Sequence, residues 1–260
     1  MTCTLGRLAA SMTRALILAA ALSAAGAGPG TAQTALPTLA PIPPKLEARY
    51  ALSAAPTALR AAAAVYLLAP DEGYVLSREG TNGITCLVER TAWELVDFRD
   101  DIFIPLCYDA AGAGGHLKAI IDTARMRAEG LTPRQVRERV EAAYADGSYE
   151  TPSRAGLSYM VSPVMRAAGP PDMSVQTMAM PHLMFYASGV SNADIAAAPD
   201  RADPATLVNP FIDRQGHDAQ SYIIVITGAA EKARILADEA PLIADLCAYR
   251  DVLCLRHDGH

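Results

Sequence analysis

The sequence predicts an α+β fold: a mainly antiparallel sheet with an αα-hairpin packed on one face and a C-terminal helical segment. The observation behind this prediction is the order of segment types along the chain. Short segments with β-type composition come first, two segments with helical periodicity follow, and further β-type segments come after them. Strands, then helices, then strands again are typical of an α+β domain, and we find no internal repeat.

Residues 1–32 are predicted to be a removable export signal. Arg7 and Arg14 give a positively charged start, an apolar run extends from Ala15 to Ala25, and small residues precede a cleavage site at Gln33. This run is too short to cross a bilayer, which requires about 20 apolar residues. We therefore expect a soluble mature protein, periplasmic or secreted, with no transmembrane segment.

The mature chain is expected to have three parts. Residues 33–45 form a proline-rich leader, residues 46–227 form the α+β domain, and residues 228–260 form a C-terminal helical extension.

The first part of the domain begins with an alanine-rich helical stretch over 45–63, broken near Pro56. Val65–Ala69 and Tyr74–Glu79 follow as strands, and the residues between them have the composition of a turn.

Asn82-Gly83 predicts a second hairpin, between 74–81 and 84–90, because this dipeptide tolerates positive φ at both turn positions. A two-residue turn there would make Arg78 and Glu89 diagonal neighbours on one face.

The middle of the domain is predicted to be a strand at Ile104–Asp109 followed by a helical hairpin. Residues 112–115 are glycine-rich and are expected to be a flexible connection. Helical periodicity then runs from Leu117 to Gly130. Thr132 and Gln135 match the capping-box pattern at the start of a second helix that ends at Gly147. The remaining predicted elements are three strands and two helices: Leu157–Ser162, Met180–Ala187, Tyr222–Thr227, Ala229–Glu239 and Leu242–Tyr249.

The charge of the chain argues against nucleic acid and anionic membranes as partners. The formal net charge is −6, and the leader removes two arginines without removing an acid. Both excluded partners attract positive charge. An unidentified small ligand or an envelope protein is the expected partner, and no cofactor is predicted.

Four cysteines remain after removal of the leader, and an even number in an oxidising compartment favours two disulfides. Three pairings are possible, and proximity in the chain favours Cys86–Cys107 and Cys247–Cys254. The latter two cysteines, with His257 and His260, also have the composition of a metal site. The oxidising compartment favours the bridge.

Met178, Met180, His182 and Met184 would share one face if they belonged to one strand. Thioether and imidazole ligands suit copper, in particular Cu(I), so a periplasmic copper-binding protein is one hypothesis. Packing of the methionines in a buried core is the alternative that we favour.

His182 is also a candidate general base, oriented by Glu89 or Asp109 from a neighbouring strand. This hypothesis makes the protein a hydrolase-like enzyme, although the sequence lacks the motifs G-x-S-x-G and H-E-x-x-H.

Two strings, EGTNGITCLVER over 79–90 and PHLMFYA over 181–187, resemble a family of uncharacterised exported bacterial proteins. The resemblance implies no known activity. Because no catalytic set is recognised and several polar loops can shape a pocket, a non-catalytic binding role ranks first, the hydrolase second and the copper protein third.

Overall fold

The computed structural model describes residues 39–256 and contains an eight-stranded mixed sheet with the order β2-β1-β3-β4-β5-β8-β10-β9. Neighbouring strands are antiparallel except β1 and β3, which are parallel. The predicted α+β class with a mainly antiparallel sheet is confirmed. The strands are β1 (Ala64–Ala69), β2 (Gly73–Arg78), β3 (Thr85–Glu89), β4 (Ile104–Tyr108), β5 (Leu157–Met160), β8 (His182–Tyr186), β9 (Phe211–Arg214) and β10 (Ser221–Ile226).

Two further strands, β6 (Met165–Gly169) and β7 (Ser174–Met178), form a separate antiparallel pair. Neither this pair nor β9 was predicted from the sequence. The β6 sequence Met-Arg-Ala-Ala-Gly contains no β-branched or aromatic residue, and β9 is four residues long. Composition and alternation are therefore weak signals for these strands.

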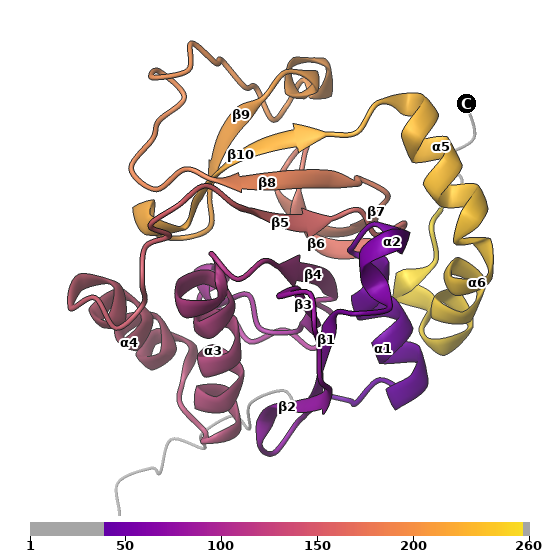
Figure 1. Ribbon diagram of the computed structural model, residues 1–260, viewed down its shortest axis with the longest axis horizontal. Coiled ribbons are helices and arrows are strands. Elements are labelled where there is room, and N and C mark those ends of the chain that lie inside the picture. The colour runs from indigo at the N-terminus through magenta and orange to yellow at the C-terminus, as the bar shows by residue number, and fades with distance from the viewer. Residues whose placement is uncertain (1–38, 257–260) are drawn as a thin grey trace, which may run out of the picture. The chain divides into compact units, whose positions relative to one another are not determined.

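Six α-helices accompany the sheet in the described part of the chain. Figure 1 shows α3 and α4 together at one side of the view, and α1, α2, α5 and α6 at the other. The αα-hairpin is confirmed, including the capping box between Thr132 and Gln135 at the start of its second helix. The helices are α1 (Pro44–Ser53), α2 (Thr57–Arg60), α3 (Lys118–Ala128), α4 (Pro133–Ala145), α5 (Ala229–Asp238) and α6 (Ala240–Tyr249).

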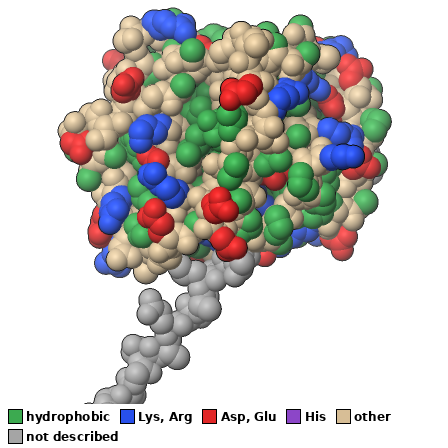
Figure 2. Space-filling model, turned by 60° about the horizontal axis from the view of Figure 1, so that its bottom comes forward, with side chains coloured by type: hydrophobic (Ala, Val, Ile, Leu, Met, Phe, Trp, Pro, Cys, Tyr) green, Lys and Arg blue, Asp and Glu red, His purple; other side chains and the backbone are tan. Residues whose placement is uncertain are grey.

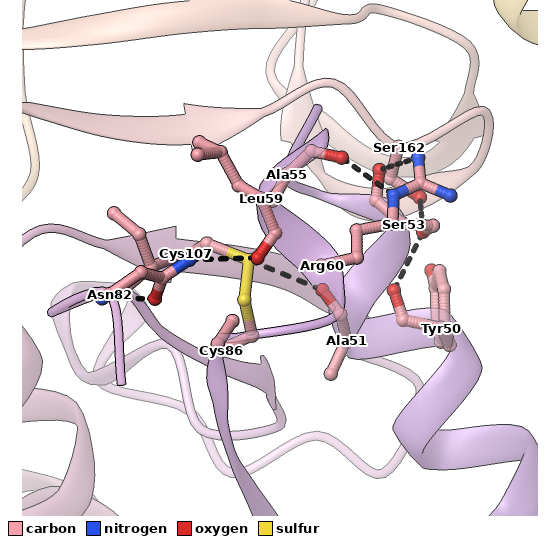
Figure 3. The surroundings of a disulfide bond; sticks show 12 residues. Tyr50, Ala51, Ser53, Ala55, Leu59, Arg60, Asn82, Cys86, Cys107 and Ser162 are labelled. Carbon is pink, nitrogen blue, oxygen red and sulfur yellow. Dashed lines mark hydrogen bonds between the residues drawn. A yellow bond between two sulfur atoms is a disulfide. The ribbon is translucent and has the colours of Figure 1, made fainter. Parts of the chain in front are cut away.

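One face of the sheet packs against α1 and α6 and contains a disulfide. Cys86 and Cys107 are direct partners on β3 and β4, with Cα atoms 4.1 Å apart, and they are bonded to each other. Figure 3 shows this bond beside α1, where the Ser53 and Ser162 hydroxyls lie 2.7 Å apart. Cys247 and Cys254 form the second disulfide, so both favoured pairings are confirmed.

The prediction of a hairpin at Asn82-Gly83 is wrong. Strand β1 lies between β2 and β3, so the connection crosses from one side of β1 to the other. Gly83 does adopt a positive φ of 74°, but the Asn82 side chain donates to the carbonyl of Leu59 and accepts from the amide of Ile84. Arg78 donates to the carbonyls of Arg60 and Ala63 and is not a neighbour of Glu89.

The glycine-rich segment before α3 is tightly packed, so the expectation of a flexible connection is also wrong. A Cβ atom on Gly115 would lie 2.0 Å from the carbonyl oxygen of Glu150, and one on Gly112 would lie 2.2 Å from the Tyr186 hydroxyl. Glycine is required here for close approach of neighbouring groups. The segment places His116 in the protein interior.

The expected leader (1–32), His257 and His260 lie outside the described residues. Within residues 39–256, no helix is both long and apolar enough to cross a membrane. Figure 2 shows a face on which basic, acidic and hydrophobic side chains are intermingled.

Candidate functional site

A cavity of about 280 Å³ lies on the sheet face opposite the Cys86–Cys107 disulfide. Directly paired residues share a face of a sheet, and the pairs Glu89–Ile104, Met160–His182 and Met184–Ile224 all line this cavity. Strand β6, the turn that follows it and a short 3₁₀ turn at Trp93–Leu95 contribute further walls. The cavity therefore brings together segments from most of the chain.

Most of the cavity wall is apolar. It includes five methionines, several aliphatic side chains and Trp93, the single tryptophan of the chain. Flexible thioethers fill irregular space and adapt to ligands of different shape. The methionines are Met160, Met165, Met173, Met180 and Met184.

Three carboxyl groups interrupt this apolar wall: Glu89 at the end of β3, Glu94 in the 3₁₀ turn and Asp213 on β9. Asp213 forms an ion pair with Arg201, whereas neither glutamate has an ion pair with any residue of 39–256. Within that range Glu89 forms no side-chain hydrogen bond, and the Glu94 carboxyl accepts from its own backbone amide. Glu89 is 8% exposed, so its carboxyl is almost wholly removed from bulk water.

Burial dominates the ionisation of these carboxyls. It raises the pKa of Glu89 well above the usual range, and the nearby charge of Glu94 raises it further. Burial also raises the pKa of Glu94 to about 7. The pKa of Asp213 is raised by burial and lowered in part by Arg201. Burial therefore favours the neutral acid form of Glu89.

His182 begins β8 and lines the same cavity. Its Nδ1 lies 2.7 Å from the carbonyl oxygen of Met180. Because a carbonyl only accepts, Nδ1 carries the proton and Nε2 is left as an acceptor. Burial lowers the pKa of His182, so the ring is neutral near pH 7.

The structure brings His182 and Glu89 to one cavity but does not place them in contact. Two strands, β4 and β5, lie between β3 and β8, which separates the two backbones by roughly 14 Å at the usual strand spacing. A backbone carbonyl, and not a carboxylate, holds the imidazole ring.

Asp109, the other proposed partner of His182, lies outside the cavity lining. Its carboxylate accepts hydrogen bonds from the amides of Ala111, Gly112 and Leu157 and from the hydroxyl of Tyr186. These bonds give Asp109 a structural role in the turn after β4.

The four residues of the copper hypothesis do not share one strand. Met178 ends β7 and pairs with Met165, whereas His182 begins β8 after a break. Met180, His182 and Met184 line the cavity, and Met178 does not. No group of three or more His, Cys, Asp or Glu side chains in residues 39–256 is arranged to hold a metal ion. Copper binding stays a prediction.

Trp93, Glu94 and Asp213 were not predicted from the sequence as members of the site. Glu89 could be predicted because it is a polar residue at the end of an apolar strand. Glu94 lies in a short 3₁₀ turn, and Asp213 lies on the strand that was not predicted. Nothing in their local sequence indicates that they share a cavity.

A comparison of the chain with protein-family models, with curated proteins and with solved structures finds no match. The site's own geometry therefore carries the functional argument.

Proposed function

We propose that this protein binds a small, largely apolar molecule in the cavity on the sheet face. The observation that carries the proposal is a partly enclosed apolar space with a small number of polar groups on its wall. Its volume of about 280 Å³ is close to the lower end of the range for small-molecule sites, roughly 300–1,000 Å³. A ligand of modest size fits this space.

Binding is favoured over hydrolysis because the described cavity wall lacks a hydroxyl, thiol or amine nucleophile. No Ser, Thr, Cys or Lys is among the described residues that line it. His182 is held by a carbonyl, and the Glu89 carboxyl is too far away to orient it. These features do not match the nucleophile–base–orienter arrangement of covalent catalysis.

We also propose that the protein binds its ligand outside the cytoplasm. The support is the pair of disulfides, which persist in oxidising compartments, together with the leader-like sequence of residues 1–32. Mass spectrometry of the protein from its native envelope fraction tests this placement. We expect a chain that begins at Gln33 and has no free thiol; a chain that retains residues 1–32 and has all five thiols free would contradict it.

Trp93 provides a direct test of ligand binding because it is the single tryptophan and lines the cavity. We expect hexanol, a small neutral probe, to cause a saturable change in Trp93 fluorescence and to raise the melting temperature, since a ligand that binds the folded state stabilises it.

A matched pair of variants shows whether hexanol binds in this cavity. Ala167 lines the cavity, and Ala167→Leu is expected to occupy part of the space and weaken hexanol binding. Ala230 is exposed at the start of α5, so Ala230→Leu should leave binding unchanged. Each variant's thermal unfolding is measured first to establish that it is folded. No saturable response, or the same response in Ala167→Leu as in wild type, would overturn the proposed function.

A further inference from the structure

The cavity wall carries two carboxyl groups that no basic side chain balances. Two arginines line it, but Arg201 is paired with Asp213 and Arg214 is paired with Asp218. Glu89 and Glu94 remain without a cationic partner in residues 39–256.

The surroundings of Glu89 indicate what kind of ligand the cavity binds. It is 8% exposed, lines the cavity and forms no hydrogen bond or ion pair with any described residue. A carboxylate that is largely removed from bulk water and has no protein partner is costly to keep ionised. A ligand that donates hydrogen bonds and carries positive charge would satisfy this carboxylate.

The apolar part of the cavity wall suits the hydrocarbon end of such a ligand. Trp93 and Phe211 offer aromatic surface, and the methionine thioethers offer soft, adaptable surface. Aromatic faces attract organic cations. A metal ion is a poor alternative, because the acidic side chains of the described residues do not converge as a metal-ligand set.

We propose, building on the ligand-binding function above, that the ligand class is an organic ammonium ion with a hydrocarbon body. Its charged nitrogen binds at Glu89, with Glu94 adding negative potential, and its hydrocarbon part packs against the apolar wall of the same cavity.

The affinity for such a ligand rises with pH. Binding requires the ionised form of Glu89, and burial raises its pKa. A primary alkylamine stays protonated up to about pH 10, like lysine. The other charged or titratable groups around Glu89 are Tyr74 on β2 and Tyr108 on β4 and, in the cavity, Glu94, Asp213, Arg201, Arg214 and His182.

Three probes with the same hydrocarbon chain test the proposal: hexylammonium, hexanol and hexanoate. Each is titrated into the full protein with Trp93 fluorescence as the readout. We expect hexylammonium to bind about tenfold more tightly than hexanol at pH 8, because one charge-assisted hydrogen bond accounts for about this difference in affinity. This advantage should decrease at pH 5.5, and hexanoate should bind most weakly.

The variant Glu89→Gln keeps the shape of the side chain and removes its charge. It should abolish the preference for hexylammonium over hexanol. Glu94→Gln should reduce the preference in part. Glu138→Gln, an exposed position on α4, makes the same change in net charge away from the cavity and should have no effect.

The outcomes separate this inference from the proposed function. Equal binding of hexanol and hexylammonium, tighter binding of hexanoate, or an unchanged preference in Glu89→Gln would overturn the cation proposal and leave the ligand-binding cavity standing. Failure of all three probes to bind would overturn the proposed function itself.

Discussion

His116 is a buried histidine whose two ring nitrogens form no hydrogen bond with the described residues. The ring packs against Tyr186 and Tyr222, with centroid distances of 4.9 Å and 4.8 Å. Burial lowers the pKa of His116 to about 4. The unfolded chain therefore binds a proton on this residue at a higher pH than the folded chain does.

His116 makes the protein sensitive to acid. Its contribution to stability is complete above about pH 6.5 and is lost as the pH falls toward 4, which corresponds to about 3 kcal/mol. The variant His116→Leu has no titratable group at this position. Urea unfolding should show a smaller loss of stability between pH 7 and pH 4 in the variant than in wild type. Equal losses in the two proteins would contradict this prediction.

At the residue scale, the sequence identified part of the site and missed the rest for a physical reason. Glu89 and His182 were predicted because polar residues stand out within apolar strands. His116 was not identified, since its burial depends on glycines that allow the chain to pack against Glu150 and Tyr186. Contacts of that kind join residues far apart in the sequence and have no local signal.

At the scale of elements, Glu47 joins helix α1 to strand β1. It is 2% exposed, and its carboxyl oxygen accepts from the amide of Leu68 at 2.9 Å. Burial raises the pKa of Glu47 to about 7, although the bond from Leu68 and the charge of Arg90 lower it in part. This contribution to stability is complete below about pH 4.5 and is lost as the pH rises through 7.

Glu47→Gln keeps an oxygen acceptor for Leu68 and removes the titration. We expect wild type and variant to have similar stability at pH 4, and the variant to be more stable at pH 8 by up to about 3 kcal/mol. Denaturant unfolding at the two pH values measures the difference. A stability difference that is independent of pH would show that ionisation of Glu47 is not its cause.

The two disulfides are expected to differ in their effect on stability. The Cys86–Cys107 bond closes a loop with a sequence separation of 21, and the Cys247–Cys254 bond closes one of 7. Because a longer loop loses more entropy on closure, paired replacement by alanine should cost about 3 kcal/mol for the first bond and about 2 kcal/mol for the second.

Denaturant unfolding of the two double variants, each against wild type without reductant, checks this order. A larger loss for the Cys247/Cys254 variant would contradict the loop-entropy argument.

Elements with strong local sequence signals were predicted correctly. Features that depend on pairing between strands far apart in the sequence were not. The capping box at Thr132 and the helical periodicity of α3 and α4 are local, and the structure confirms them. The hairpin at Asn82-Gly83 failed because β3 pairs with β1 and not with its predecessor in the chain. The choice of partner strand depends on the whole sheet.

At the scale of the whole molecule, the sheet separates two packed regions. Helices α1 and α6 and the Cys86–Cys107 disulfide contribute to the core on one face. The other face carries a second core and the cavity, to which segments from Glu89 to Ile224 contribute. The class of fold follows from the order of elements, but the cavity depends on how all of them pack.

The methionines provide the most direct measurement of the central claim, that the cavity binds a small ligand. Nine methionines occur in the chain, of which five line the cavity, while Met126 is buried in α3 outside it. In protein labelled with [methyl-¹³C]methionine, hexanol should shift the signals of the five cavity methionines in proportion to occupancy and leave Met126 in place. Shifts of Met126 without shifts of the cavity methionines, or no shifts at saturating probe, would contradict the account.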